Sequence, residues 1–532
     1  MPLGYFSLIL HAHLPFVRHP EYPEFLEEDW LYEAITEVYL PLIFIFESLR
    51  KAGAKPRLAM NVSPPLSEML ADELLQTRYT THLEKLTELA EKELKRTRAE
   101  APEFVEAAEM YAANLNASLR LWNEVYKRDL ISAFRELQNE GVLEIITCGA
   151  THGFLPLVST REARRAQIRI AVKNYKKHFH RQPRGIWLPE CAYEPGLEDL
   201  LKEEGIEYFI SDTHAILYGE PRPRFGVHAP VLCPNGVAVF ARDLETSQQV
   251  WSAEVGYPGD PLYREFYRDI GWDMPLEYLE PYLHDGNRRH LGLKYYRITG
   301  RDVTQQAKLP YLPSLAREKA AQNASHFIGE RIKQAKTLRE TFDGHPPLVV
   351  SPYDAELYGH WWFEGPQFID FFFRKLHFDQ SEIVPVSPGD FLDSGIPIQI
   401  QQPTASSWGE NGYYKVWLND ANSWMYPFQH DAEQKMTELA DRFNEPDETQ
   451  LRILKQLARE LLLAQSSDWA FQIYQGTTVE YSSRRFQSHI QRFGLLAEML
   501  ETGNIDEELL VEIEFRDNIF SEIDHRIYRS RT

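Results

Sequence analysis

The sequence has few cysteines and lacks the common motifs that bind phosphates or activate a serine. Its 532 residues include only three cysteines, Cys148, Cys191 and Cys233, with no Cys-x-x-Cys pair. So sparse and odd-numbered a set excludes a disulfide framework and argues against a thiolate zinc site. No P-loop, dinucleotide-binding glycine pattern or Gly-x-Ser-x-Gly elbow occurs. We therefore expect a reduced, cytoplasmic protein without a cofactor.

Basic residues and long apolar runs are also scarce. The chain has 57 Lys and Arg against 79 Asp and Glu, a net charge of −22. A surface this negative repels phosphate backbones and anionic lipids, so nucleic acid and membranes are not expected partners, whereas neutral substrates are not penalised. No run of 18 apolar residues occurs and the N-terminus lacks a basic leader region. Neither a membrane helix nor a signal peptide is expected.

Aromatic residues, by contrast, are plentiful. They make up 13% of the chain, with 11 Trp, 27 Tyr and 29 Phe. Indole faces stack on the C–H faces of sugars, and the indole N–H serves hydroxyl groups. Most tryptophans lie in predicted loops, and Trp408 and Trp417, among Gly, Asn and Asp residues, are the best candidates for sugar platforms. Core packing is the alternative for each of them.

Short apolar segments alternate with helical patterns through the first half of the chain and resume near Pro347. Strand-like segments cover 5–10, 57–62, 142–147, 185–188, 208–210 and 347–350. This alternation implies helical crossovers and a parallel sheet, hence an α/β fold. An aromatic, Asp- and Pro-rich stretch interrupts it, and helical patterns dominate near the C-terminus. We expect a β/α region at 1–245 that resumes at 293–400, an inserted helical segment at 246–292 and a C-terminal helical domain at 401–532.

Two carboxylates follow predicted strands directly. Glu190 comes after Gly185–Leu188, and Asp354 comes after Pro347–Val350. Active sites lie at the carboxyl ends of parallel strands. A pair of carboxylates amid Trp and Tyr suits cleavage of a glycosidic bond, one attacking the anomeric carbon and the other protonating the leaving oxygen. An ion pair with Arg, or a helix cap, is the structural alternative for each.

Histidines and a further aspartate occupy the same strand ends. His11 and His13 follow the first strand, His152 the third, and Asp212 and His214 the fifth. Three interpretations remain open from spacing alone. These groups bind a metal ion, they contact substrate hydroxyls or orient the carboxylates, or they are satisfied polar groups at the mouth of the fold.

Five segments together resemble glycoside hydrolase family 57 over nearly the whole chain. They are HAHLP from His11, GVLEIITCGATH from Gly141, WLPECAY from Trp187, PYDAELYGHWW from Pro352 and AQSSDWAF from Ala464. His152-Gly-Phe-Leu-Pro and the run from Val250 to Gly271 are similar to the family's α-glucan branching enzymes. The segments around Glu190 and Asp354 are the most specific in combination. In the first segment Leu14 replaces the Gln common in the family.

The resemblance implies a retaining reaction on α-1,4-glucan. By motif, Glu190 matches the nucleophile and Asp354 the general acid/base, and Asp468 would face the cleft. The resemblance also implies an incomplete (β/α)7 barrel with an inserted helical subdomain and a C-terminal helical domain, and no metal. A lid near Leu217–Pro234 would carry a tyrosine, for which Tyr218 is the nearest candidate. Beyond His11, His13, His152, Asp212 and His214, residues expected to contact glucan are Trp30, Trp272, Trp361, Trp408 and Trp417.

Three other functions remain as alternatives. An α-amylase or 4-α-glucanotransferase would use the same two carboxylates with another acceptor. A metal-dependent deacetylase would use the His and Asp set. A glucan-binding protein without activity would have lost a carboxylate, which the presence of both Glu190 and Asp354 disfavours.

Overall fold

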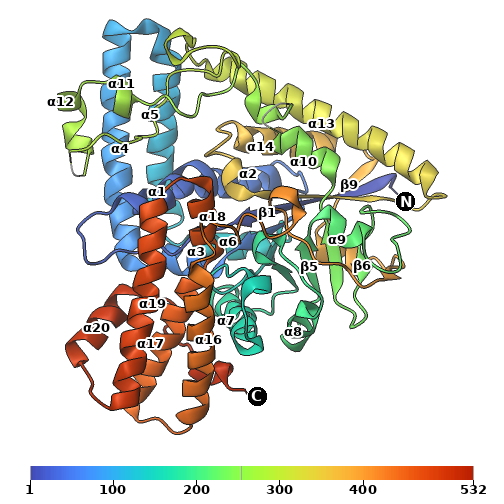
Figure 1. The fold of residues 1–532 in the computed structure, drawn as a ribbon. Helices are drawn as coiled ribbons and strands as arrows, with labels where there is room; N and C mark the ends of the chain where they lie inside the picture. The colour runs from blue at the N-terminus through green and yellow to red at the C-terminus, as the bar shows by residue number, and fades with distance from the viewer. Residues whose placement is uncertain (1, 253–254, 285, 531–532) are drawn as a thin grey trace.

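The structure is a computed structural model that describes residues 2–252, 255–284 and 286–530. It is an α/β fold with parallel strands at the centre and helices around them, as expected from the sequence (Figure 1). Its strands are β1 (Gly4–Ala12), β2 (Leu58–Val62), β3 (Leu143–Ile146), β4 (Gly185–Trp187), β5 (Tyr208–Ser211), β6 (Val231–Leu232), β7 (Ala238–Ala241), β8 (Leu348–Asp354), β9 (Ile383–Pro385) and β10 (Gln399–Ile400).

The strands form two sheets. The first has the order β3-β2-β1-β8, with β9 also paired to β1, and the second the order β10-β6-β7-β5-β4. Every pairing is parallel except β6 with β7. β1, β2 and β3 are buried almost throughout. Strands buried on both faces read as continuous apolar runs, which explains why the sequence predicts them.

Backbone contacts link the two sheets at both ends. A parallel bridge joins Thr147, just after β3, to Ile186 of β4. The amide of Asp243, just after β7, donates to the carbonyl of Val350 in β8 at 2.9 Å. Because parallel strands end at one edge, the residues that follow β1, β3, β4 and β8 meet there.

Helices cover the outside of the sheets. Those that alternate with the strands are α1 (Asp29–Ala34), α2 (Leu40–Lys51), α3 (Pro64–Leu70), α6 (Leu130–Asn139), α7 (Arg161–Phe179), α8 (Leu197–Glu203), α9 (Thr213–Leu217), α13 (Pro313–Thr341), α14 (Gly365–Phe378) and α15 (Pro388–Asp393). A π-helical turn, Ile35–Tyr39, connects α1 to α2 without a break. Such turns frequently mark functional sites, and this one directs Tyr39 toward the strand ends.

The start of α7 is set by Thr160, although the sequence Ser159-Thr160-Arg161-Glu162 also fits a capping box that begins at Ser159. Thr160 is the N-cap, and its hydroxyl accepts from the amide of Ala163. Ser159 instead donates from its amide and its hydroxyl to Glu433 at 2.7 and 2.6 Å. A partner 274 residues away in the chain thus overrides the local pattern.

A long helical hairpin and the segment after α10 pack together at one end of the molecule (Figure 1). The hairpin is α4 (Glu73–Glu100) and α5 (Val105–Arg120). The segment follows α10 (Leu244–Trp251) and contains α11 (Ile270–Asp273) and α12 (Leu276–Leu279). Tyr278 donates its hydroxyl to Glu93, and Lys92 donates to the carbonyl of Tyr278, both at 2.8 Å. The described part of 246–292 therefore has only short helices and depends on the hairpin for packing.

The C-terminal part is a helical bundle below the sheets in Figure 1. It contains α16 (Met425–Arg442), α17 (Glu448–Ala464), α18 (Ser467–Gln475), α19 (Val479–Thr502) and α20 (Glu507–Arg516). A capping box between Asp447 and Gln450 starts α17. The first turn of α18 lies against the strand ends, because Ser467 donates its amide to the carbonyl of His152 at 2.9 Å. Among the described residues, none of the helices has the length and apolarity needed to cross a bilayer.

Candidate active site

Glu190 lies in a strained turn directly after β4. Its φ is 62°, in the left-handed region that residues other than glycine rarely adopt. The φ angles of Cys191 (50°) and His152 (58°) lie in the same region. The turn is held by the amide of Cys191, which donates to the carbonyl of Leu188 at 2.8 Å. Strain of this kind persists where surrounding structure enforces it, and it concentrates at functional sites. Here it turns a carboxylate toward the common strand edge.

Two hydrogen bonds hold the Glu190 carboxylate. The indole N–H of Trp408 lies 2.8 Å from Oε2, and Oγ of Ser467 lies 2.8 Å from Oε1. The backbone amide of Trp408 also donates to the carbonyl of Glu190 at 3.0 Å. Burial raises the pKa of Glu190 to about 7, with the charge of Asp468 adding to it and the two hydrogen bonds opposing it. The donors favour the ionised form that a nucleophile needs.

Asp354 lacks the hydrogen-bond donors that Glu190 has among the described residues. It ends β8 and pairs in register with His11 of β1. Among the described residues, no hydrogen bond reaches its carboxyl group, while burial and the charges of Glu356 and Glu190 raise its pKa well above the usual range. Burial without donors favours the protonated form of a carboxyl group. The two carboxyls thus differ in the way that an acid and a nucleophile must differ.

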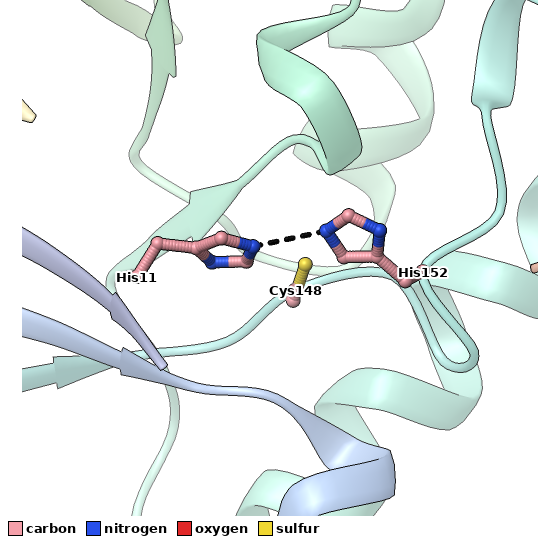
Figure 2. A group of neighbouring side chains, drawn as sticks. All are labelled: His11, Cys148 and His152. Atoms are coloured by element: carbon pink, nitrogen blue, oxygen red, sulfur yellow. Dashed lines mark hydrogen bonds between the residues drawn. The ribbon is translucent and has the colours of Figure 1, made fainter. Parts of the chain in front are cut away.

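A chain of hydrogen bonds runs behind Glu190 through two histidines. Nδ1 of His11 is 2.6 Å from Oδ1 of Asn61, Nε2 of His11 is 3.0 Å from Nε2 of His152, and Nδ1 of His152 is 2.7 Å from Oγ of Ser467. Figure 2 shows the His11–His152 contact with the thiol of Cys148 beside it. Burial lowers the pKa of both histidines, so both rings are neutral.

The Ser467 hydroxyl sets the direction of these hydrogen bonds. Ser467 donates its one proton to Oε1 of Glu190 at 2.8 Å, so its oxygen accepts from Nδ1 of His152. Nε2 of the neutral His152 ring then accepts from Nε2 of His11. Ser467 therefore connects the Glu190 carboxylate to the histidine pair.

His13 and Asp468 form the other side of this cluster. Nε2 of His13 lies 3.1 Å from Asp468, and Nδ1 lies 2.8 Å from the hydroxyl of Ser63. Burial alone would raise the pKa of Asp468, but the charge and hydrogen bond of His13 lower it to about 2. Glu356 accepts from the amide of His13 at 3.2 Å and from the hydroxyl of Tyr39 at 2.5 Å. Asp468, from α18, is thus placed beside the strand ends.

Donor atoms suited to a metal ion lie close together in this cluster. Those of His13, His152 and Asp468 are within 4.8 Å of one another, as are those of His11, Cys148 and His152. The hydrogen bonds just described use the inward-facing nitrogens of His11 and His13, so an ion would have to replace them. The arrangement favours contacts between side chains.

Asp212 and His214 do not join that cluster. Asp212 forms an ion pair with Arg242 at 2.5 Å and lies 3.4 Å from His214, whose Nε2 donates to the carbonyl of Gly412 at 2.5 Å. Both side chains therefore support the loop that carries Trp408. A metal site that combines them with the first-strand histidines, one of the sequence-based alternatives, has no support in this geometry.

The structure corrects the interpretation of Trp417. Its side chain is 1% exposed and stacks on Phe154 with ring centroids 4.6 Å apart. A Cβ at Gly409 would lie 2.5 Å from the Trp417 ring, so the backbone beside Trp408 rests directly on this indole. Trp417 is a core residue that supports the Trp408 loop, and no face is free for a sugar. The Gly and Asn residues around Trp417 in the sequence suggested an exposed loop, but in the fold its indole ring is buried.

Other candidate aromatic residues keep accessible faces. Trp272 and Trp361 are 53% and 58% exposed, and Trp361 stacks on Phe266 at 4.5 Å. Trp30 is partly buried and meets Tyr481 edge to face at 5.8 Å. Tyr218, in the expected lid, is 60% exposed. Exposed rings of this kind can stack on a sugar, which buried indoles cannot do.

The reassignment of Trp417 gives a testable expectation. Trp417→Ala leaves a cavity in the core, and such truncations lower the free energy of unfolding by about 3–5 kcal/mol. We expect a lower thermal midpoint in calorimetry, whereas Trp361→Ala, at an exposed ring, leaves the midpoint nearly unchanged. An unchanged midpoint for Trp417→Ala together with weaker glucan binding would restore its assignment as a sugar platform.

Four residues of the site are not among the site residues expected from the sequence. Asn61, Ser467 and Glu356 contact Glu190 or the histidines, and Tyr39 donates to Glu356. A signal existed for three of them. Asn61 is the polar residue in an apolar strand, Ser467 precedes Asp468, and Glu356 lies two residues after Asp354. Tyr39, within an apolar helix, gave none.

The chain is similar over its full length to enzymes of known structure. The description "Glycosyl hydrolase family 57" matches residues 7–350, and "1,4-alpha-glucan branching enzyme, C-terminal" matches residues 429–528. A 1,4-alpha-glucan branching enzyme of Thermococcus kodakarensis is 36% identical, the match covering 97% of this chain and 77% of that protein.

Two solved structures superpose over all of this chain. One is an alpha-amylase of Thermotoga maritima, covered completely (TM-score 0.94, 43% identity). The other is a branching enzyme of Pyrococcus horikoshii, covered to 97% (TM-score 0.89, 36% identity). This chain belongs to glycosyl hydrolase family 57.

Proposed function

We propose that this protein is a 1,4-α-glucan branching enzyme that cleaves α-1,4-glucan with retention of configuration. The observation that carries the proposal is the contrast between two carboxyls at one sheet edge. Glu190 receives hydrogen bonds from Trp408 and Ser467, and Asp354 receives none among the described residues. The names of the Thermococcus and Pyrococcus relatives and the match to a branching-enzyme C-terminal region support the acceptor assignment.

The proposed reaction has two steps. Glu190 attacks the anomeric carbon, the bond to the leaving oxygen breaks, and Asp354 gives its proton to that oxygen. Asp354, now ionised, then removes the proton from the 6-hydroxyl of another chain, whose oxygen attacks the anomeric carbon and releases Glu190. An α-1,6 branch forms and both carboxyls return to their first state. Water in place of the 6-hydroxyl gives hydrolysis.

The remaining site residues are proposed to bind or orient the glucan. His11, His13, His152 and Asp468 line the cleft behind Glu190, while Asp212 and His214 hold the loop of Trp408. Residues proposed to stack on glucose units are Trp30, Trp272, Trp361 and Trp408.

We also propose that the two sheets are parts of one incomplete (β/α)7 barrel. The bridge between Thr147 and Ile186 and the hydrogen bond from Asp243 to Val350 support closure through β1, β2, β3, β4, β5, β7 and β8. The proposed domains are the barrel at 1–245 and 293–400, the inserted segment at 246–292 and the helical domain at 401–532. Active sites of such barrels lie at the carboxyl ends of the strands.

An α-amylase is the second candidate, because the Thermotoga relative with that name is 43% identical over the full chain. Incubation with amylose separates the two functions. A branching enzyme produces chains that a debranching enzyme shortens, with few new reducing ends. An amylase produces reducing ends in step with cleavage and no branch points. Reducing ends without branches would contradict the proposal.

No metal is expected in the chemical step, because two carboxyls supply the nucleophile and the proton. Dialysis against a chelator should leave the initial rate on amylose unchanged at a temperature well below unfolding. Loss of the initial rate, restored by added zinc, would favour the deacetylase-like alternative. Assay of wild-type protein dialysed without chelator is the control.

The hydrogen bond from Trp408 to Glu190 should matter for the reaction itself. Trp408→Phe keeps an aromatic face and removes the N–H that donates at 2.8 Å. Hydrogen bonds to charged groups contribute about 1.5–3 kcal/mol, so kcat/KM should fall roughly 10- to 100-fold. The acid limb of its pH profile should move to higher pH, because the carboxylate loses a donor.

Trp424→Phe is the matched control for this change, since its indole N–H also donates a hydrogen bond, to the carbonyl of Ala421 at 3.1 Å. That variant should behave as wild type. If Trp408→Phe keeps the wild-type rate and pH profile but binds amylose more weakly, the ring is only a platform for glucose.

A further inference from the structure

Two histidines and an aspartate meet outside the active centre, where the inserted segment packs against the helices. They are Asp29 of α1, His82 of α4 and His284, which follows α12 in the chain, and one donor atom of each lies within 4.8 Å of the others. Nε2 of His284 is 3.4 Å from Oδ1 of Asp29. Donor atoms around a tetrahedral zinc with bonds of about 2.0–2.1 Å are roughly 3.4 Å apart. The spacing already suits ligands of one ion.

On the inner side, Nε2 of His284 and Oδ1 of Asp29 form a long hydrogen-bond contact of 3.4 Å, which an ion would replace. Glu24 binds Nδ1 of His284, so in the neutral ring the lone pair lies on Nε2. Arg289 donates to Oδ2 of Asp29 at 2.9 Å, on the side away from Oδ1. A carboxylate behind the histidine and a donor behind the carboxylate are the usual second partners of metal ligands.

His82 is the least occupied of the three. Within the part of the chain that the structure describes, no hydrogen bond reaches its ring, and its nearest charged neighbours are Asp29 and His284. Burial lowers the pKa of His82, so the ring is neutral and able to bind a metal. This neutral imidazole lies beside a histidine and a carboxylate, and among the described residues its ring nitrogen is free to bind an ion.

We propose that Asp29, His82 and His284 bind Zn²⁺, with water as the fourth ligand. Two imidazoles and one carboxylate are ligands that zinc prefers, and here one pair of donor atoms is 3.4 Å apart and all three lie within 4.8 Å. A pocket of about 160 Å³ lined by His82, His284 and Glu24 gives the ion a route from solvent. The positive charges nearby are already paired, Arg289 with Asp29 and Lys85 with Glu24.

The ion ties three separate parts of the chain together. Asp29 belongs to a helix beside the strands, His82 to the long hairpin, and His284 to the inserted segment. Since the inserted segment has little regular structure of its own, a bond to the hairpin would fix its position relative to the barrel. The site is structural, and it takes no part in the reaction of Glu190 and Asp354.

Metal content tests the proposal. Protein stripped with a chelator and dialysed against Zn²⁺ should hold one zinc per chain more than His82→Ala or Asp29→Asn treated in the same way. Comparison between variants is needed because His13, His152 and Asp468 also have donor atoms within 4.8 Å of one another. His377→Ala, at an exposed histidine on α14, is the matched control and should hold as much zinc as wild type.

A second variant keeps the test open if the first ones fold poorly. Glu24→Gln changes no ligand and should weaken zinc binding about 10- to 100-fold, as loss of an outer partner typically does. Zinc should raise the thermal midpoint of wild type, and higher concentrations should be needed for Glu24→Gln. Equal zinc content in wild type and folded His82→Ala, no zinc in either, or equal affinity in Glu24→Gln would overturn the proposal.

Discussion

Glu190→Gln should abolish branching and hydrolysis together. The substitution keeps the size of the side chain and its acceptor oxygen, but the amide cannot attack the anomeric carbon. Loss of a nucleophile costs up to about 10⁶ in kcat in other enzymes, and we expect at least roughly 10⁴ here. Initial rates on amylose, followed by both branch points and reducing ends, measure the effect.

The control for this change is Glu194→Gln, the same substitution four residues later. Glu194 forms an ion pair with Arg164 at 2.6 Å and should tolerate neutralisation. Thermal unfolding should show that Glu190→Gln is folded. Azide should restore cleavage in Glu190→Ala by attacking the anomeric carbon from the side that Glu190 leaves free, giving a β-glycosyl azide. A folded Glu190→Gln protein that retains more than a few per cent of activity would remove Glu190 from the mechanism.

Asp354→Asn should be nearly inactive on amylose, by about 10²–10⁴-fold, because the leaving chain then departs without a proton. A substrate with a good leaving group needs no such proton, so part of its cleavage should survive. The glycosyl-enzyme should then accumulate, because the amide introduced by this substitution cannot activate the acceptor. Mass spectrometry of a peptide containing Glu190 would detect the bound sugar.

The pH profile provides the second half of this test. The pKa of Glu190 is raised to about 7, so kcat/KM should fall as the pH drops below that value and Glu190 takes up a proton. The pKa of Asp354 is raised well above its usual range, so activity should also fall at higher pH, where the acid loses its proton. In Asp354→Asn the basic limb should disappear with the activated substrate. Equal losses on both substrates, with the basic limb intact, would assign the acid to another residue.

The strands that place the site could be predicted because they are buried on both faces. Short apolar runs such as 5–10 and 208–210 are typical of strands in the core, and the structure has strands there. β7, Ala238–Ala241, was missed although it is equally apolar, because it directly follows a loop rich in Pro and Gly. β6, β9 and β10 are two or three residues long and leave no periodic signal.

In the site, too, the features set by local sequence could be predicted, and the features set by distant segments could not. Glu190 and Asp354 were identifiable because a carboxylate directly after a buried strand is conspicuous in sequence. Their different environments were not, because Trp408 and Ser467 reach Glu190 from distant segments. The prediction that Trp417 is a sugar platform was wrong for a related reason. The exposure of a side chain is decided by tertiary contacts, and here Phe154 and the backbone at Gly409 cover the indole ring.

The two donors on Glu190 also bear on when the proposed nucleophile becomes functional during synthesis. They lie 218 and 277 residues after it, so the strands up to β8 are synthesised before either donor. A nascent chain that ends near residue 400 contains both carboxyls, yet the Glu190 carboxylate lacks the two donors that hold it. Such late, long-range closure is slow relative to local folding. We therefore expect full activity toward glucan only after the last helices dock.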